Sequence, residues 1–344
     1  MPGILVVNSG STSLKLSLVD DDETSVPVGS LAEAGADSAR GDVLGVAHRI
    51  VHGGGRFTKP VLLDGSVLGE LRMLAELAPL HTGAALAAVE EAWSALPDVR
   101  HVAVFDTTFH ATIPEEAATY AVPRRWAAEW GVRRYGFHGL SVQWAAERAT
   151  ASRLVVCHLG GGCSVTAVRD RRSVDTTMGF SPLDGVPMAT RSGALDPQIL
   201  LYLLRTRRLG LEDLEQALEH ESGLLGVSGI SPRVEELERS TEPAAALALD
   251  VFTHSVAAAV AAMTTSLGGL DALVFTGGVG ENSSFVRARV CERLRFLGIE
   301  LDADANESAV PDADVATGGS AVRVLVVAAR EDVVAARAAR RLVG

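Results

Sequence analysis

The chain carries one pattern twice, first at residues 5–20 and again at residues 154–170. Each copy begins with an apolar run, passes through a short turn of small residues, and continues as an alternating run that ends in charged residues. Alternation with a period of two is typical of a strand with one buried face, so each copy predicts a β-hairpin. Two copies in a chain of 344 residues predict duplicated domains, each opening with a hairpin whose turn points at a shared cleft.

The rest of the chain predicts an α/β fold. Further strand candidates are residues 43–51, 102–105, 273–275 and 322–328. Helical periodicity marks residues 68–78, 84–96, 115–130, 142–150, 197–205, 211–219, 243–267, 284–297 and 332–342. Strands that alternate with helices are typical of mixed or parallel sheets covered by helices. Segment 244–267 is apolar nearly all round, which indicates a helix buried either inside its domain or against another subunit.

The composition narrows the classes of partner. The formal net charge of −12 argues against nucleic acid or an anionic membrane, although local arginines can still hold small anions. The longest apolar run, residues 256–263, is shorter than a membrane span, and the N-terminus lacks the basic region of a signal peptide. The three cysteines form no CxxC pair, which is typical of free thiols in a reducing compartment. The sequence therefore predicts a cytoplasmic protein with no nucleic-acid or membrane partner.

Two glycine-rich turns follow predicted strands, at residues 160–162 and 277–280. Glycine lets a backbone approach a phosphate closely and aim its N–H groups at it. Most glycine turns are simply turns, but two of them together with the opening loop favour a nucleotide site. The chain contains no GxxxxGK[ST] motif and no GxGxxG fingerprint, which argues against a P-loop protein and a dinucleotide dehydrogenase.

Three basic side chains lie beside glycines or small residues: Arg49, His138 and Arg191. Arginine is the natural bidentate partner of carboxylate and phosphate, whereas the plain alternative is an arginine in solvent. His48 and His52 share one strand, where their spacing does not give zinc-ligand geometry.

Two acids occupy positions where α/β proteins present functional groups. Asp106 ends an apolar strand, although an aspartate before threonine is also a common cap. Glu331 begins the last predicted helix, where a carboxylate also stabilises the helix N-terminus without any catalytic role.

These blocks together resemble the acetate kinase (acetokinase) family, of the acetate and sugar kinase, Hsc70 and actin superfamily. The matching blocks run in the family's order along the whole chain, at residues 8–15, 48–54, 105–110, 135–139, 158–160, 175–185, 190–193, 222–229 and 275–283. The resemblance implies an α/β fold of two duplicated ribonuclease H-like domains, residues 1–107 plus 333–344 and residues 108–332. It also implies a homodimer, with helix 243–267 as a candidate contributor.

The resemblance implies a role for each matching residue. Asp106 would be the catalytic carboxylate, and the substrate carboxylate and phosphoryl group would be held by Arg49, Arg191 and His138. The methyl group of acetate would lie against Val51, Leu80, Phe137 and Pro182. Mg²⁺, or Mn²⁺ in its place, would be held by Asn8 and Glu331. ATP or ADP would contact Lys15, His158, Leu159, Gly160, Gly161, Gly162, Gly278, Val279, Gly280, Glu281 and Asn282.

The implied chemistry suits these side chains. A carboxylic acid with a pKa near ~4–5 is already ionised at neutral pH, so the nucleophile needs no general base. It needs positive groups that cancel repulsion and stabilise a loose phosphoryl transition state. Asp106 is therefore expected to position metal or water rather than to accept a proton.

Departures from the family pattern leave alternatives open. Gly161 replaces the usual Asn, and Arg233 and Glu235 reverse the charges of the usual Asp-x-Arg element near the adenosine. The alternatives are a propionate or butyrate kinase, a relative that uses pyrophosphate or another nucleoside triphosphate, and a catalytically weakened nucleotide-binding regulator.

Overall fold

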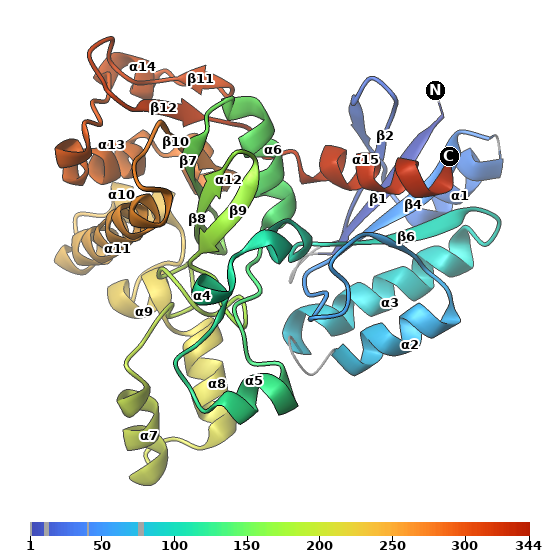
Figure 1. Ribbon diagram of the computed structural model, residues 1–344, viewed down its shortest axis with the longest axis horizontal. Coiled ribbons are helices and arrows are strands. Elements are labelled where there is room, and N and C mark those ends of the chain that lie inside the picture. The colour runs from blue at the N-terminus through green and yellow to red at the C-terminus, as the bar shows by residue number, and fades with distance from the viewer. Residues whose placement is uncertain (1, 10–13, 40, 75–78) are drawn as a thin grey trace. The chain divides into compact units, whose positions relative to one another are not determined.

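A computed structural model describes residues 2–9, 14–39, 41–74 and 79–344, with the side chains of residues 39 and 79–82 outside that description. The chain divides into two compact units (Figure 1). Unit 1 contains residues 1–111, 121–144 and 330–344, and unit 2 contains residues 112–120 and 145–329. The domain boundaries implied by the family resemblance, 1–107 plus 333–344 and 108–332, stay a prediction.

Unit 1 is built on a mixed sheet with the strand order β3-β2-β1-β4-β6-β5. The strands are β1 (Gly3–Ser9), β2 (Leu14–Val19), β3 (Ser25–Pro27), β4 (Val43–Ile50), β5 (Val61–Leu62) and β6 (Arg100–Phe105). β1, β2 and β3 form an antiparallel meander, whereas β4 and β6 run parallel to β1. The register places Asn8 beside Arg49, and Ile50 beside Phe105. The carboxyl ends of β1, β4 and β6 therefore meet at one edge of the sheet.

Unit 2 repeats this topology in a sheet with the strand order β11-β12-β10-β7-β8-β9. Its strands are β7 (Arg153–Leu159), β8 (Cys163–Arg169), β9 (Arg172–Thr176), β10 (Ala272–Thr276), β11 (Ala313–Asp314) and β12 (Arg323–Val326). The antiparallel meander β7-β8-β9 corresponds to β1-β2-β3, and the parallel strands β10 and β12 correspond to β4 and β6. The shared strand order confirms the duplicated α/β fold predicted from the sequence repeat.

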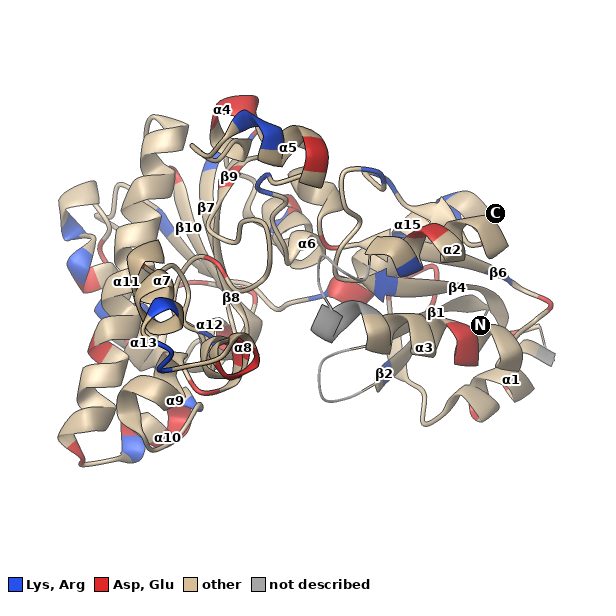
Figure 2. Cartoon of the chain, turned by 90° about the horizontal axis from the view of Figure 1, so that it is seen from below, with Lys and Arg blue, Asp and Glu red and all other residues tan. Residues whose placement is uncertain are grey.

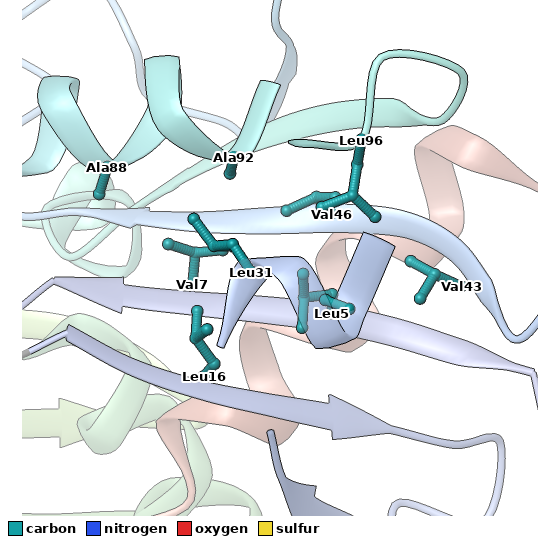
Figure 3. Packing of buried hydrophobic residues seen from close by; sticks show 10 residues of the cluster. Leu5, Val7, Leu16, Leu31, Val43, Val46, Ala88, Ala92 and Leu96 are labelled. Carbon is teal, nitrogen blue, oxygen red and sulfur yellow. The ribbon is translucent and has the colours of Figure 1, made fainter. Parts of the chain in front are cut away.

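Helices cover both faces of the unit 1 sheet. α1 (Leu31–Ala39) and α3 (Pro79–Ala95) pack on the face that carries Leu5, Val7 and Val46 (Figure 3). α15 (Glu331–Val343) contacts β1, β4 and β6. Gly45 of β4 permits this approach, because a Cβ there would lie 3.0 Å from Cγ1 of Val343 on α15. The remaining elements are α2 (Gly65–Met73), α5 (Arg124–Trp130), the 3₁₀ turn Thr108–Thr112, and α6 (Gly139–Ala149), which continues into unit 2.

Unit 2 packs its helices around α11 (Pro243–Leu267), which contacts β7, β8 and β9. Asp250 is the one charged residue of α11, and Figure 2 draws most of this helix as uncharged. By length and composition α11 could cross a membrane, but a buried core helix passes the same test. The other helices are α4 (Glu115–Ala118), α7 (Pro197–Arg205), α8 (Leu211–His220), α9 (Gly223–Ser228), α10 (Val234–Arg239), α12 (Gly277–Asn282), α13 (Ser284–Arg293), α14 (Ala303–Glu307) and the 3₁₀ turn Arg295–Leu297.

The continuous helix predicted over residues 115–130 is wrong. The structure has α4 (Glu115–Ala118) and α5 (Arg124–Trp130), separated by residues 119–123. Pro123 lies at the start of α5, with a ψ of 128°. Proline lacks an N–H group and disfavours helical backbone at the preceding residue, so the helix must end and restart here.

Candidate active site

The candidate catalytic groups of unit 1 gather around Arg49 at the carboxyl edge of its sheet. The guanidinium donates from Nε to Oδ1 of Asp106 at 2.8 Å and from Nη2 to Oδ2 at 2.7 Å, so the pair is bidentate. Nη1 donates to Oδ1 of Asn8 at 3.2 Å and lies 2.6 Å from Oε2 of Glu331. Asn8, Arg49 and Asp106 lie at or just beyond the ends of β1, β4 and β6. The fold therefore joins three strand ends to the first residue of α15.

Burial and unequal charge set the electrostatics of this cluster. Asp106 is 1% exposed, and the side chains of Arg49 and Glu331 are 16% and 15% exposed. Burial acts to lower the pKa of Arg49, but the charges of Asp106 and Glu331 outweigh it and raise that pKa. Burial raises the pKa of Glu331, with Arg49 opposing the rise and Asp106 adding to it. Two carboxylates share one guanidinium, and the surplus negative charge favours a further cation.

The oxygen atoms of this cluster fit a magnesium ion that substrate oxygens would complete. Asn8 supplies an amide oxygen and Glu331 supplies carboxylate oxygens, which are the hard donors that Mg²⁺ prefers. No three His, Cys, Asp or Glu side chains form a metal cluster among the residues that the structure describes. Mg²⁺ in phosphoryl-transfer sites is held by one or two carboxylates together with substrate phosphates, so a full protein cage is not required.

His48, the neighbour of Arg49 in the chain, belongs to a buried imidazole pair. Nε2 of His101 lies 3.0 Å from the carbonyl oxygen of Leu96, so this nitrogen carries the proton. Nδ1 of His101 then accepts from Nε2–H of His48 at 2.8 Å. Nδ1 of His48 is left as a buried acceptor without a partner in the described part of the chain. Burial, with the charge of His101 adding to it, lowers the pKa of His48 to about 3.

This pair predicts a loss of stability in acid. Folding holds His48 neutral, whereas the unfolded chain titrates near ~6.5, so its stabilisation is complete above that pH and is lost as pH falls toward the folded pKa. Acidification from about pH 7 to about pH 5 should lower the free energy of unfolding by about 2 kcal/mol through this residue. His48→Gln should remove this contribution to the pH dependence of the free energy of unfolding, which urea titrations at several pH values measure. The exposed His254 provides the control His254→Gln, which should keep the wild-type slope. A wild-type slope in His48→Gln would contradict the assignment.

His138 is held in a strained turn against Asp106. Its φ of 58° lies in the left-handed region that residues other than glycine rarely adopt. The N–H of Gly139 donates to the carbonyl oxygen of Asp106 at 3.0 Å, and a Cβ on Gly139 would lie 2.1 Å from that oxygen. Only glycine permits this approach, so the backbone of the turn is fixed beside Asp106. Strained residues of this kind concentrate at functional sites, which supports a role for His138.

The expected methyl pocket of unit 1 lies beside this turn. Phe137 is 1% exposed, and its ring meets His52 edge-on with the centroids 5.3 Å apart. His52 also meets the ring of Tyr135, with the centroids 4.6 Å apart. Val51 is half-buried and precedes His52 in the chain. Leu80 belongs to α3, but its side chain lies outside the described residues. Phe137, His52 and Tyr135 therefore form one aromatic cluster centred on His52.

In unit 2, Arg191 and Pro182 lie on one loop, residues 177–194, here called the 177–194 loop. Nη1 of Arg191 donates to the carbonyl oxygen of Pro182 at 3.0 Å and lies 3.6 Å from Sδ of Met188. Burial lowers the pKa of Arg191, with the charge of Glu219 opposing the change. None of the ion pairs among the described residues of unit 2 includes Arg191. Contacts within the 177–194 loop therefore determine the orientation of the Arg191 guanidinium.

Unit 2 also contains a cavity of about 840 Å³ into which both glycine turns open. Gly160 and Gly161 line it from the turn between β7 and β8, and Gly278 lines it from α12. A Cβ on Gly161 or Gly278 would meet no atom within 4 Å, so these backbones face open space. This volume is in the range of small-molecule and cofactor sites.

Comparisons with known proteins agree with this architecture. The model of the acetokinase family matches residues 26–337. The acetate kinase of Nostoc punctiforme is 47% identical over 298 residues, which cover 83% of this chain and 73% of the relative. The chain belongs to the acetokinase family. As a member, it is a kinase that transfers a phosphoryl group to a carboxylate acceptor.

Solved structures support the acetokinase fold over the whole chain. The propionate kinase of Francisella tularensis is similar with a TM-score of 0.90 at 32% identity, covering 98% of this chain and 99% of its own. The acetate kinase of Porphyromonas gingivalis is similar with a TM-score of 0.87 at 30% identity, covering 100% of both chains.

The residues expected to bind nucleotide in an acetokinase fall into two groups in this structure. The cavity is lined by Gly160, Gly161, Gly278, Val279 and Asn282. Outside its lining lie Lys15, His158, Leu159, Gly162, Gly280 and Glu281. Lys15 is exposed on β2 of unit 1, where its Cα pairs with that of Asn8. The carboxylate of Glu281 accepts from the N–H groups of Gly277 and Ala329, both at 3.0 Å. Glu281 therefore ties the start of α12 to the segment after β12.

The Asp-x-Arg element of the family, which is replaced in this chain by Arg233-Val234-Glu235, also lies on the cavity wall. Arg233 and Glu235 both line it. Each is already paired, Arg233 with Glu236 and Glu235 with Arg239 at 2.7 Å. All four belong to α10 or precede it directly, so the reversed charges are matched within one short segment.

Gly161, where the family has Asn, gives a prediction about nucleotide affinity. A Cβ at this position meets no atom within 4 Å, and φ lies outside the left-handed region, so Gly161→Asn should fold normally. The added amide can form one more hydrogen bond to nucleotide, worth about 1 kcal/mol. Initial-rate kinetics should show the KM for ATP falling by about fivefold, with the KM for acetate unchanged. Gly161→Ala, which adds no amide, is the matched control. An equal fall in KM for both variants would contradict the hydrogen-bond explanation.

The three cysteines are structural rather than reactive. Cys157, Cys163 and Cys291 are buried, and none forms a disulfide. Burial raises the pKa of Cys163 to about 12, and its thiol donates to the carbonyl oxygen of Gly160 at 3.4 Å. The nucleophilic form of cysteine is the thiolate, so at neutral pH Cys163 is an inert thiol that supports the glycine turn.

His52 and His110 have structural roles that no local sequence pattern indicates. Nε2 of His110 donates to the carbonyl oxygen of Phe137 at 2.8 Å, and Gly136 lies against its ring. Burial lowers the pKa of His110 to about 4, so the ring stays a neutral donor that fixes the turn before His138. Both histidines lie within blocks that match the family, at residues 48–54 and 105–110. Their position in these blocks is the sequence feature that could have marked them as part of the site.

Proposed function

We propose that the protein catalyses reversible, Mg²⁺-dependent phosphoryl transfer from ATP to acetate, giving acetyl phosphate and ADP. The observation that carries this proposal is the half-buried Arg49, bound by Asp106, Asn8 and Glu331 where three strands end. That cluster combines a fixed cation with hard oxygen donors, which are the two requirements of a phosphoryl-transfer site. Family membership supports the acceptor class.

In the proposed reaction an acetate oxygen attacks the γ-phosphorus of ATP. The new O–P bond forms as the bond from the γ-phosphorus to the β,γ-bridging oxygen breaks, and ADP leaves with that electron pair. Arg49 and Arg191 offset the negative charge of the two reacting anions, and His138 donates to the equatorial oxygens. When bound, Mg²⁺ supplies charge neutralisation for the phosphate oxygens. No proton moves from acetate, because its carboxyl group is ionised at neutral pH.

Asp106 has a positioning task in this scheme. Both of its carboxylate oxygens accept from Arg49, so the plane of the guanidinium is fixed. Bidentate pairing of this kind gives orientation as well as energy. With the substrate already ionised, Asp106 orients Arg49 and adds negative charge that favours the metal.

Acetate is the proposed acceptor because the acetate kinase of Nostoc punctiforme is 47% identical to this chain. Two of the residues expected at the methyl group are also held by defined contacts. Phe137 is held edge-on against His52, and Pro182 is tied to Arg191 through its carbonyl oxygen. A hydrophobic pocket separates acids that differ by one methylene by only ~1–3 kcal/mol, so propionate should react more slowly rather than not at all.

ATP is the proposed donor because the glycine turns open into a cavity with room beyond the phosphates. A cavity of about 840 Å³ suits a nucleoside triphosphate, whereas pyrophosphate would leave most of it empty. The lining also includes Leu224 and Phe252, whose apolar side chains suit a base.

A hydroxamate assay tests the proposal. Purified protein with acetate, ATP and Mg²⁺ should accumulate acyl phosphate that hydroxylamine traps, and omission of Mg²⁺ should abolish the signal. Propionate and butyrate should give lower kcat/KM than acetate, and pyrophosphate should not replace ATP. Absence of acyl phosphate with every acid and donor would overturn the proposal in favour of a nucleotide-binding regulator.

We also propose that the protein is a cytoplasmic homodimer. α7 has no buried residue and exposes Ile199, Leu201, Tyr202 and Leu204 at 47%, 56%, 41% and 37%. Contiguous exposed apolar side chains mark interaction surfaces. Buried free cysteines suit a reducing compartment. Light scattering should give twice the mass of the chain, and Leu201→Glu should shift it toward the monomer. A wild-type monomer would contradict the dimer.

A further inference from the structure

Tyr120 ends the first segment of unit 2, directly before the chain passes into unit 1 at Ala121. Its side chain contacts the 177–194 loop at two points. The hydroxyl accepts from the N–H of Phe180 at 3.0 Å and donates to Oδ2 of Asp184 at 3.1 Å. One phenol therefore holds both the backbone and a carboxylate of a loop that is distant in sequence.

Gly179 shows how closely the loop fits this hydroxyl. A Cβ on Gly179 would lie 1.8 Å from the hydroxyl oxygen of Tyr120 and 2.3 Å from Oδ2 of Asp184. Separations this short are not possible between nonbonded atoms, so any side chain at residue 179 would break the contact. The Tyr120 hydroxyl therefore has room only because residue 179 is glycine.

The second half of the same loop, residues 184–194, is held together by its own hydrogen bonds. Oδ1 of Asp184 accepts from the N–H of Gly185 at 2.8 Å, and the carbonyl oxygen of Gly185 accepts from the N–H of Ala194 at 2.8 Å. From within this closed part, Arg191 donates to the carbonyl oxygen of Pro182 at 3.0 Å, and Pro182 lies between Phe180 and Asp184, the two contacts of Tyr120. The hydrogen bonds of Tyr120 therefore hold the base of a loop whose interior carries Arg191 and Pro182.

We propose that Tyr120 is a positioning residue that sets the aim of Arg191 and the place of Pro182, and so determines how the acceptor carboxylate binds. This inference rests on the proposed function. The guanidinium of Arg191 is held by Pro182 and Met188 of its own loop and has no ion pair among the described residues of unit 2. Its direction follows the loop, and small displacements of a reacting or orienting group cost large factors in rate.

Tyr120→Phe tests the proposal because it removes the hydroxyl and keeps the ring. The loss of these hydrogen bonds should lower kcat/KM for acetate by about tenfold, mainly through KM, while the KM for ATP stays within about twofold. A general loss of folded protein would lower kcat alone and leave both KM values unchanged. Ser152→Ala is the matched control: it removes another hydroxyl of unit 2 that donates to an aspartate, Asp170 at 2.7 Å, and it should keep wild-type kinetics.

Gly179→Ala provides a second, independent test of the contact between Tyr120 and the 177–194 loop. Alone it should impair acetate kinetics more than Tyr120→Phe, because the new methyl group collides with the hydroxyl. The double variant should recover at most part of that loss, because the hydroxyl at 1.8 Å is gone but Oδ2 of Asp184 still lies 2.3 Å from the new methyl group. Wild-type kinetics for Tyr120→Phe, or for Gly179→Ala, would overturn the inference and leave the proposed function intact. A wild-type protein inactive with every carboxylate would overturn both.

Discussion

Arg49→Lys should lower kcat/KM for acetate by about a thousandfold or more, because arginines on a transferring phosphoryl group are worth that much. Lysine keeps the charge but cannot form the bidentate pair with Asp106 at 2.8 and 2.7 Å while also reaching Asn8 and Glu331. The loss should appear in kcat as well as in KM, because the guanidinium acts on charge that develops in the transition state. Steady-state kinetics with the hydroxamate readout measures both constants.

Two controls separate this effect from unfolding. Arg56→Lys changes an arginine that is 67% exposed and paired with Glu70, and it should keep wild-type kinetics. Arg49→Ala should also destabilise the fold by about 3–5 kcal/mol, because it strips the cation from buried carboxylates. Thermal melts should therefore place Arg49→Lys close to wild type and Arg49→Ala well below it. A loss of less than about tenfold for Arg49→Lys would remove Arg49 from the proposed chemistry.

Asp106→Asn should lower kcat by about a hundredfold or more, because orientation of a reacting group to within an ångström is worth that factor. The amide keeps an oxygen toward Arg49 but loses the charge and one of the two acceptors of the bidentate pair. It also removes the one surplus negative charge of the cluster, which favours a metal beside Glu331 and Asn8. Kinetics as a function of Mg²⁺ concentration distinguishes the two consequences.

The Mg²⁺ titration of Asp106→Asn gives a different result for each of the two possible roles of Asp106, favouring the metal or orienting Arg49. If Asp106 acts mainly by favouring the metal, excess Mg²⁺ should restore most of the activity. If it acts by orienting Arg49, kcat should stay low at saturating Mg²⁺. Glu331→Gln is the matched variant: the proposed metal role predicts a raised Mg²⁺ requirement there in either case. Near-wild-type kcat in Asp106→Asn would exclude any catalytic role for this carboxylate.

The sequence predicts the architecture well where one local pattern repeats. The paired patterns at residues 5–20 and 154–170 led to two domains of the same topology, because alternation is a local property of strands. The helix predicted over residues 115–130 failed at Pro123, where a single residue overrides the periodicity around it. Arg49, Asp106 and Glu331 were each proposed from local context, but their mutual ion pairs depend on which strands become neighbours.

Contacts between distant residues account for what the sequence analysis missed. The link from Tyr120 to Asp184 joins two segments through a phenol and a carboxylate that carry no periodic signal. Glu281 matches a nucleotide-binding block by position, yet its carboxylate is occupied by two backbone N–H groups. His110 fixes the turn before His138 from an adjoining segment. In each case the partner is set by tertiary packing, which local patterns do not record.

The most direct test that an acetate oxygen forms the new bond to phosphorus follows that oxygen atom. Acetate labelled with ¹⁸O in its carboxylate, incubated with the protein, ATP and Mg²⁺, should give acetyl phosphate that ³¹P NMR detects. Attack by the carboxylate on the γ-phosphorus predicts a phosphorus signal shifted by a directly bonded ¹⁸O. Acetyl phosphate with an unshifted signal, or none at all, would contradict the account.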